Sequence, residues 1–258
     1  MRVAASLYTM FTDVPLVERY QKAAKLGFKL VECPFPYTVD AEVLKKEADK
    51  YGLKHVFINA PPGDFAGGER GFGSLASEKE RFIKSIDLAI HYANVLECKR
   101  IHVMAGINRV HDQKSYNTFV ENIRYASEKL AKDGIECSIE PINNHTIPGY
   151  YLNSMELAVQ VLEEVNAPNL KIDYDVFHLQ LIQGQLTHLL KKHASIIGHI
   201  QVAQVPNRDE PDADGEIDYA YVMDLLKQTN PNWIVGGEYV NTTDDRTGDW
   251  VKKFGLEF

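Results

Sequence analysis

The 258-residue chain has few of the features that mark secreted, membrane or disulfide-bonded proteins. It holds three cysteines, Cys33, Cys98 and Cys137, an odd number with no CxxC spacing. We interpret them as small apolar packing residues of a protein in a reducing compartment. No apolar run approaches the ~20 residues that a membrane helix needs. The first residues, MRVAASLYTM, show no signal-peptide pattern. We therefore expect a cytoplasmic protein that has no membrane partner.

Positive charge is also scarce. The chain has 28 Lys and Arg against 36 Asp and Glu, a net charge of −8. Nucleic-acid-binding proteins favour a basic face, so this balance argues against a nucleic-acid partner. It also means that an anionic substrate would need local positive charge, because the overall field repels it.

What the chain does have is a regular alternation of short apolar runs and amphipathic segments. The apolar runs predict eight β-strands, at residues 2–7, 29–34, 54–59, 100–105, 136–141, 170–176, 197–203 and 234–240. Helical patterns lie between them, most clearly at 15–27, 77–96, 153–165, 218–229 and 244–254. Eight β–α units in this length predict a single (β/α)8 TIM barrel over residues 1–258, since ~250 residues is typical of that fold.

A doubly wound open sheet is the alternative α/β fold. Such a sheet would normally place a glycine-rich phosphate-binding turn after its first strand. The residues that follow the first predicted strand here, SLYTMFTDVP, contain no glycine. The barrel is therefore the preferred prediction.

In a TIM barrel the active site lies at the carboxyl ends of the strands. Four consecutive predicted strands end at or near Glu140, Asp175, Gln201 and Glu238. Three carboxylates in one cavity would repel one another unless a cation lay between them. An all-oxygen set suits Mg²⁺ or Mn²⁺. Each acid alone could be a solvated loop residue or pair with a lysine or arginine, but four strand ends in register favour a metal site.

Several motifs carry a resemblance to a known family. The strand motifs are IEPIN, IDYDVFH, GHIQVA and GGEY, and the loop motifs are PPGDFAGGERGFG (61–73) and NRDEPDADGEIDY (207–219). Together they resemble the hydroxypyruvate isomerase family of the xylose-isomerase-like barrels, a group that includes ketose 3-epimerases. The resemblance implies that Glu140, Asp175, Gln201 and Glu238 bind the metal. It also implies that Glu140 and Glu238 serve as the acid–base pair. Gln201 stands where the sugar epimerases usually have histidine, and its amide oxygen still suits a hard cation.

Two arginines are candidates to bind a substrate carboxylate, because a guanidinium can do so through two hydrogen bonds. Arg70 lies in the long glycine-rich loop 60–77, and Arg208 in the loop after the seventh predicted strand. Each could instead pair with its sequence neighbour, Glu69 or Asp209. Loops of this length are often binding loops or lids, which favours a functional Arg70.

Two further residues are predicted to contact the substrate. His178, just after the sixth strand, could hydrogen-bond a substrate oxygen or could orient a metal ligand. Asn59 lies at the active end of its strand, and strand alternation predicts that His55 shares its face. Lower in the barrel we expect an ion pair between Glu136 and Lys171. His102 carries no motif, so we interpret it as a surface or packing residue.

The implied reaction converts hydroxypyruvate to and from 2-hydroxy-3-oxopropanoate (tartronate semialdehyde) by proton transfer between two glutamates. A 2-oxo-tetronate isomerase or a ketose 3-epimerase would use the same site. A DNA-repair nuclease of the same superfamily would want a basic surface and a histidine-rich cluster of several metals. A barrel that only binds a metal or sugar acid is the non-enzyme alternative. Self-association into a homo-oligomer stays open.

Overall fold

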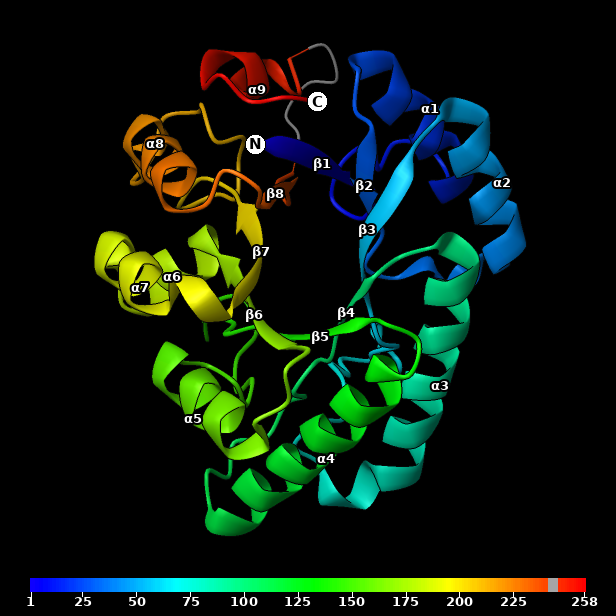
Figure 1. The fold of residues 1–258 in the computed structure, drawn as a ribbon, viewed down its shortest axis with the longest axis vertical. Helices are drawn as coiled ribbons and strands as arrows, with labels where there is room; N and C mark the ends of the chain where they lie inside the picture. The colour runs from blue at the N-terminus through cyan, green and yellow to red at the C-terminus, as the bar shows by residue number, and fades with distance from the viewer. Residues whose placement is uncertain (241–245) are drawn as a thin grey trace.

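The protein is a closed barrel of eight parallel strands. The structure, a computed structural model, describes residues 1–240 and 246–258. The strands are β1 (Arg2–Ser6), β2 (Leu30–Glu32), β3 (Lys54–Asn59), β4 (Arg100–His102), β5 (Glu136–Ile139), β6 (Leu170–Asp175), β7 (Ile197–Val202) and β8 (Ile234–Gly237). Each pairs with the next in parallel, and β1 pairs with β8 to close the ring. The predicted TIM barrel is confirmed (Figure 1).

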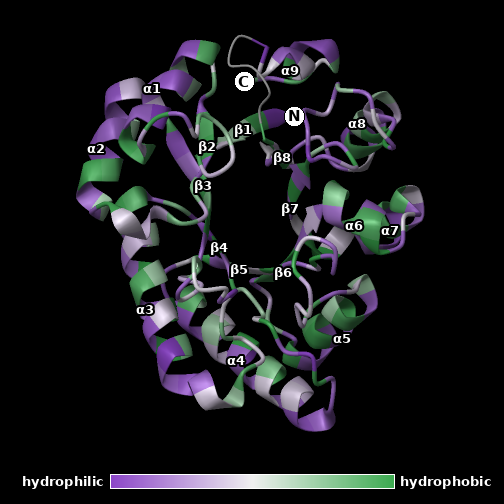
Figure 2. Cartoon of the chain, turned by 180° about the vertical axis from the view of Figure 1, so that it is seen from behind, coloured by the Kyte–Doolittle hydropathy of each residue, from purple (hydrophilic) through white to green (hydrophobic). Residues whose placement is uncertain are grey.

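The helices lie outside the ring (Figure 1). They are α1 (Leu16–Leu26), α2 (Ala41–Tyr51), α3 (Lys79–Leu96), α4 (Gln113–Ala131), α5 (Met155–Val165), α6 (Val176–Ile182), α7 (Leu186–His193), α8 (Tyr219–Thr229) and α9 (Asp249–Lys253), with short 3₁₀ turns at Pro36–Thr38, Ala76–Glu78 and Ala194–Ile196. Of the helix predicted at 244–254, residues 244 and 245 lie outside the described residues. Figure 2 shows hydrophilic and hydrophobic residues around each outer helix, as expected where one face is buried.

The interior of the barrel is unusually polar. Branched aliphatic side chains usually fill this space. Here Glu32, Asp173 and His199 are fully buried, with 0 % of each residue exposed. Phe57 stacks on the ring of His199, with centroids 4.9 Å apart. Buried polar groups need partners or a ligand, so this composition indicates a functional interior.

One irregularity in β3 changes which side chains face the interior. Val31 pairs with His55, but Glu32 pairs with Phe57, so β3 holds an extra residue at this point. A bulge of this kind reverses the alternation of side chains along a strand. His55 consequently points outward, where its Nε2 lies 2.8 Å from the hydroxyl of Tyr20 on α1. The prediction that His55 and Asn59 share a face is therefore wrong.

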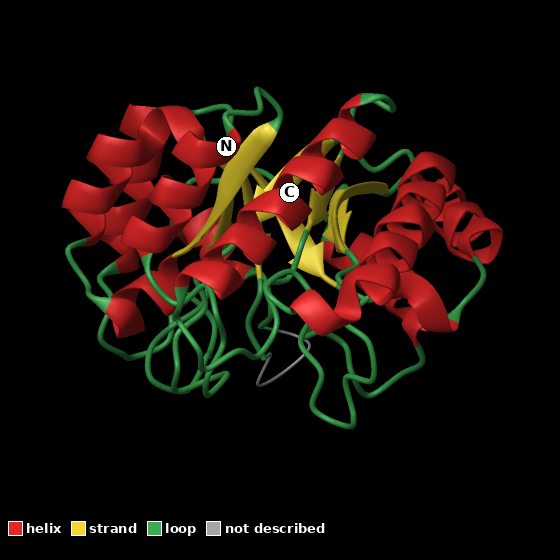
Figure 3. Ribbon diagram, turned by 90° about the horizontal axis from the view of Figure 1, so that it is seen from below, coloured by secondary structure: helices red, strands yellow, loops and turns green. Residues whose placement is uncertain are grey.

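The longer loops gather at the carboxyl ends of the strands (Figure 3). Strands β5 and β8 end earlier than predicted, so Glu140 and Glu238 lie one residue beyond them. Both residues still stand at the rim where the interior opens toward the loops. Among the described residues, no helix is both long and apolar enough to cross a bilayer.

Candidate active site

Three buried side chains converge at the carboxyl end of the barrel. One ligand atom each from Glu140, Asp175 and His178 lie within 4.8 Å of one another. Glu140 follows β5, Asp175 ends β6, and His178 lies in the first turn of α6. The predicted site residues of these two strands are thus brought together.

Asp175 has one oxygen committed to the fold and one directed at this cluster. It is the N-cap of α6, and its Oδ1 accepts hydrogen bonds from the backbone nitrogens of Phe177 (2.8 Å) and His178 (3.4 Å). Its Oδ2 lies 3.6 Å from His178 Nε2 and 3.6 Å from Arg208 Nη2. The cap holds the carboxylate in place while leaving a second oxygen available to bind a cation or a substrate.

The loop after β5 determines the protonation of His178. Asn143 Oδ1 accepts hydrogen bonds from the backbone nitrogens of His145 (2.9 Å) and Thr146 (2.8 Å), which fixes its amide. Asn143 Nδ2 therefore donates to Nδ1 of His178, at 2.6 Å. A neutral histidine that accepts at Nδ1 carries its hydrogen on Nε2. Nε2 lies 3.6 Å from Glu140 Oε1, so His178 presents a donor to the cluster rather than a metal-binding lone pair.

Gln201 offers the opposite kind of group. Its Nε2 donates to Oε2 of Glu32 at 3.0 Å. Its Oε1 is buried and has no hydrogen-bond partner among the described residues. The same is true of Oε1 of Glu140. Two buried oxygen acceptors without protein partners suit the binding of a cation.

Glu238 is bound by Arg208. The guanidinium Nη2 of Arg208 pairs with the Glu238 carboxylate, and Nε donates to the Glu238 carbonyl oxygen at 3.0 Å. Arg208 also lies over the ring of Phe177, 5.1 Å from its centroid. The alternative in which Arg208 pairs with Asp209 is not observed among the described residues. Arg208 instead joins the carboxylates predicted to form the site.

The other predicted substrate-binding residues lie around this cluster. Arg70 stacks on the Phe65 ring at 3.7 Å, and its Nη1 donates to the carbonyl oxygens of Phe65 and Glu69. It does not pair with the Glu69 carboxylate, which Arg81 binds instead. Burial, and then the charge of Glu238, raise the pKa of the Tyr8 hydroxyl, after β1, while the charges of Arg70 and Arg208 lower it.

Asn59 faces the interior at the end of β3, in register with His102, and its Oδ1 is buried without a partner among the described residues. Asn59 is on β3, and His102 is on the neighbouring strand β4. The structure therefore places it at the end of the barrel where the sequence predicted it.

The carboxylates of the site repel one another. Burial, and then the charges of Asp173, Asp175 and Glu238, raise the pKa of Glu140 well above its usual range. Burial raises the pKa of Asp175 to about 7, although Arg208 opposes the shift. Burial likewise raises the pKa of Glu32 to about 8. Because a cation favours the ionised form of every such group, this concentration of buried acids fits a divalent metal.

The set of groups that could hold such a metal follows from these contacts. Glu140 and Asp175 each bring a carboxylate oxygen to the cluster, and Gln201, paired with Asp175 on the neighbouring strand, has a buried oxygen without a partner among the described residues. Glu238 is not one of the groups within 4.8 Å of one another, and its carboxylate pairs with Arg208. A hard divalent cation prefers oxygen ligands. His178 presents a hydrogen instead and is better suited to binding a substrate oxygen or orienting a carboxylate.

The sequence interpretation missed His102. It is buried, its Nδ1 lies 3.5 Å from Glu140 Oε2, and neither ring nitrogen has a hydrogen-bond partner among the described residues. Burial lowers its pKa to about 3, so it is neutral at physiological pH. His102 is the last residue of β4, and a position at a strand end is the feature that could have identified it. The prediction extended this strand to residue 105 and so placed His102 in its middle.

The expected ion pair between Glu136 and Lys171 is wrong. Glu136 pairs with Arg100 on the neighbouring strand, at 2.5 Å, and Lys171 Nζ donates to the carbonyl oxygen of Ser195 at 3.2 Å. Parity along the strands put both residues at the same level of the barrel but could not tell which neighbour each would meet.

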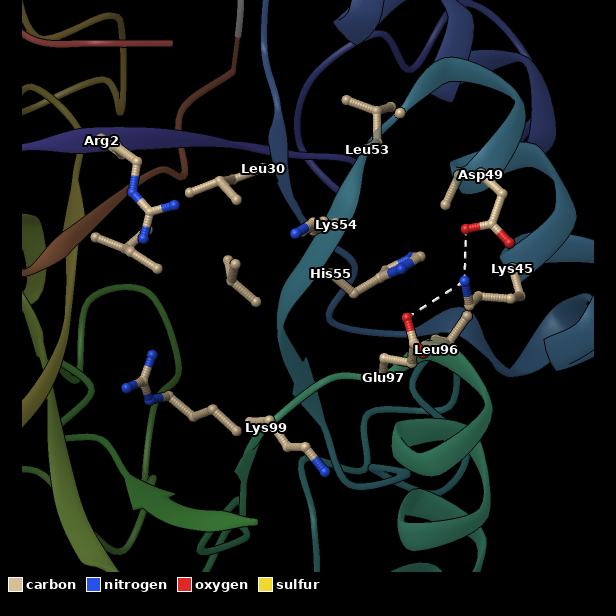
Figure 4. A pocket seen from close by; sticks show the side chains of 15 residues that line it. Arg2, Leu30, Lys45, Asp49, Leu53, Lys54, His55, Leu96, Glu97 and Lys99 are labelled. Carbon is tan, nitrogen blue, oxygen red and sulfur yellow. Dashed lines mark hydrogen bonds and ion pairs between the residues drawn. The ribbon is translucent and has the colours of Figure 1, made fainter. Parts of the chain in front are cut away.

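A separate cavity of about 550 Å³ lies at the amino ends of the strands (Figure 4). Arg2, Lys54 and Arg100 line it, and Lys45 there pairs with Asp49 (2.5 Å) and Glu97 (3.4 Å). It contains none of the predicted site residues. In this fold the amino ends of the strands serve stability, so we do not assign the reaction to this cavity.

Comparison with known proteins agrees with this geometry. The family model described as "Xylose isomerase-like TIM barrel" matches residues 20–254. A Caenorhabditis elegans protein named putative hydroxypyruvate isomerase is 48% identical over 100% of this chain and 98% of its own. The Escherichia coli hydroxypyruvate isomerase is 38% identical, over 96% of each chain. The Haemophilus influenzae 2-oxo-tetronate isomerase is also 38% identical, over 98% of this chain and 99% of its own.

Among solved structures, one described as an AP endonuclease, family 2, from Brucella melitensis has a TM-score of 0.94 and 40% identity, over 98% of each chain. The named curated relatives are isomerases, and their similarity runs the full length of the chain. The chain therefore belongs to the xylose isomerase-like TIM barrel family and, within it, to the hydroxypyruvate isomerase family.

Proposed function

We propose that the protein is a metal-assisted isomerase of a small 2-oxo-3-hydroxy acid, with hydroxypyruvate as the first candidate. The observation that carries this proposal is the pair Glu140 and Glu238. Glu140, which is buried, and Glu238, which is half-buried, both follow the carboxyl ends of their strands, as do Asp175 and Gln201 near the ends of theirs. The names of the relatives support the substrate class.

The reaction moves a proton between neighbouring carbons. Glu140 or Glu238, as a carboxylate, removes a proton from C3 of hydroxypyruvate, and the electrons form an enediolate. The other glutamate returns a proton to C2, while a proton passes from the C3 oxygen to the C2 oxygen to give 2-hydroxy-3-oxopropanoate. Glu140, Asp175, Gln201 and Glu238 would hold a divalent cation, Mg²⁺ or Mn²⁺, whose positive charge would stabilise the enediolate.

Other residues would orient the substrate. The His178 Nε2 hydrogen is positioned to donate to an oxygen that develops negative charge. Arg70 and Arg208 offer guanidinium groups for the substrate carboxylate, which the net negative protein would otherwise repel. Asn59 adds an amide at the opposite wall. All of these roles concern positioning and charge, which is where most of the catalytic effect of such a site lies.

A 2-oxo-tetronate is the second candidate substrate, because the Haemophilus influenzae relative with that name is 38% identical to this chain, as is the Escherichia coli hydroxypyruvate isomerase. DNA cleavage, suggested by the name of the Brucella structure, is opposed by the net charge of −8. A free ketose is the third candidate.

The test is an isomerisation assay with hydroxypyruvate, a 2-oxo-tetronate and free ketoses side by side, with Mg²⁺ or Mn²⁺ and with chelator. Glu140→Gln and Glu238→Gln, each checked for fold and metal content, should lower turnover by ~10²-fold or more. Glu128→Gln, on the outer surface of α4, is the control and should leave turnover unchanged. Near wild-type turnover in either site variant would refute the proposed acid–base pair, and bound metal without turnover on any substrate would favour a binding protein.

A further inference from the structure

A chain of hydrogen bonds crosses the barrel interior to reach Gln201. It begins at Arg100 on β4, which lines the amino-end cavity of Figure 4. Arg100 Nη1 lies 3.3 Å from Nδ1 of His199 on β7. Nε2 of His199 contacts Oε1 of Glu32 on β2, and Oε2 of Glu32 accepts from Nε2 of Gln201 at 3.0 Å. Four residues on three strands thus connect the base of the barrel with a predicted metal ligand.

The direction of every bond in this chain follows from its first member. A guanidinium has only donors, so Nδ1 of His199 must accept from Arg100. Nε2 of His199 then carries the hydrogen and donates it to Glu32. In its ionised form Glu32 accepts from His199 through Oε1 and from Nε2 of Gln201 through Oε2. No pair of acceptors lies face to face along these hydrogen bonds.

The surroundings leave Glu32 little freedom. Glu32 and His199 are both fully buried, so water cannot replace either hydrogen bond. If the Gln201 amide turned over, its oxygen would face the carboxylate oxygen of Glu32, and two buried acceptors would oppose each other. The Oε1 of Gln201, which has no partner among the described residues, is therefore held away from Glu32, on the strand next to that of Asp175.

We propose that Glu32 is a positioning residue, which, backed by His199 and Arg100, fixes the amide of Gln201 so that its oxygen, not its nitrogen, faces the divalent cation. This inference rests on the proposed function for the identity of the ligand. It adds His199 and Arg100, which the sequence patterns did not connect with the site, and it gives Glu32 a defined role. Glu32 itself does not touch the substrate or the metal.

The proposal can be tested by exchanging the hydrogen-bond donor and acceptor between positions 32 and 201. In Glu32→Gln the new amide donates toward position 201, so Gln201 turns over and presents its nitrogen to the metal. Mn²⁺ affinity, measured from the signal of free Mn²⁺ in electron paramagnetic resonance, should fall by ~10–100-fold. In the double variant Glu32→Gln with Gln201→Glu, residue 32 donates and residue 201 accepts, so an oxygen again faces the metal at unchanged total charge. Most of the lost affinity should return.

Two results of these Mn²⁺ measurements would overturn the proposal. Wild-type Mn²⁺ affinity in folded Glu32→Gln overturns the proposal, and so does a folded double variant that binds Mn²⁺ no better than Glu32→Gln does. Where the single variant is unstable, the double variant decides, because it keeps both the hydrogen bond and the charge. Glu128→Gln is the control for an exposed glutamate and should bind Mn²⁺ as the wild type does.

A second measurement does not depend on metal. In metal-free protein, the side-chain NH₂ resonance of Gln201, assigned by its loss in Gln201→Glu, should show one proton shifted downfield and protected from exchange by the Glu32 carboxylate. Glu32→Gln should abolish both features, and an unchanged resonance would refute the inference. If wild-type protein bound no Mn²⁺, the proposed metal would be wrong, and this spectrum would still decide the role of Glu32.

Discussion

Gly236 lies directly against the carboxylate of Glu32. A Cβ atom at position 236 would stand 1.8 Å from Oε1 of Glu32 and 2.5 Å from its Cδ. Both residues face the interior, from β8 and β2, and Glu32 has no exposed surface into which it could move. Glycine is therefore required at 236 by the space that the carboxylate occupies.

Gly236→Ala should destabilise the protein and disturb the Gln201 amide. Overpacking a filled core costs ~1–3 kcal/mol, and here the displaced group is also a hydrogen-bonded carboxylate. We expect the free energy of unfolding, measured by urea denaturation, to fall by at least this amount. Gly67→Ala is the control, since its added Cβ meets the exposed carboxylate of Asp64, which can rotate away. Equal stability of the two variants would show that Glu32 can move.

The barrel, and the gathering of Glu140 and Asp175 at one end of it, could be predicted from the sequence because strands leave periodic signals. Alternating apolar runs identify strands, and in parallel strands an acid at each carboxyl end must meet its neighbours. Glu140, Asp175 and Gln201 were found in this way. The bulge between Val31 and Glu32 left no such signal, because one extra residue in a strand has no compositional mark.

The orientation of side chains and their hydrogen bonds within the site could not be predicted from the sequence either. That His178 carries its hydrogen on Nε2 depends on Asn143, whose amide is fixed by two backbone nitrogens of its own loop. That Glu136 meets Arg100 rather than Lys171 depends on which of two neighbouring strands its side chain leans toward. Such choices are made by tertiary contacts, and a pattern in one sequence does not contain them.

Arg70 should matter for substrates that carry a carboxylate. Its Nη1 is used by the loop, while its remaining nitrogens have no hydrogen-bond partner among the described residues. A hydrogen bond to a charged group contributes ~1.5–3 kcal/mol, so Arg70→Gln should raise KM for hydroxypyruvate by about 10–100-fold. Steady-state kinetics with a neutral ketose should show little change. Arg81→Gln, which removes an exposed partner of Glu69, is the control, and similar KM changes for both substrate types would remove the carboxylate role.

Metal binding should strengthen as pH rises. The folded-state pKa of Asp175, about 7, lies above the ~3.9 of an unfolded aspartate, and that of Glu140 is raised as well. In metal-free protein these acids hold protons that stabilise the fold at low pH, and that contribution is lost as pH rises through about 7. A metal must displace the same protons, so its affinity increases over the same interval.

The measurement is the increase in Tm that Mn²⁺ produces at a fixed concentration, compared at pH 5.5 and pH 8. We expect a clearly larger increase at pH 8. The buried neutral histidines His55 and His102 lower stability below about pH 6.5, but they do so with and without metal, so the difference in Tm cancels their effect. An increase in Tm that stayed constant or shrank toward pH 8 would contradict carboxylate ligation.

Asn143→Asp should reverse the proton on His178. An aspartate at 143 can still accept from the backbone nitrogens of His145 and Thr146, but its second oxygen then faces Nδ1 and draws the hydrogen there. Nε2 then carries no hydrogen and cannot donate to the substrate, so kcat should fall by roughly 10–100-fold. ¹⁵N spectra of the His178 ring should show the hydrogen on Nδ1. Asn144→Asp adds the same charge one residue away, where the side-chain oxygen accepts from the Gly149 nitrogen. Equal kcat losses in both variants would attribute the effect to charge and not to the direction of the hydrogen bond.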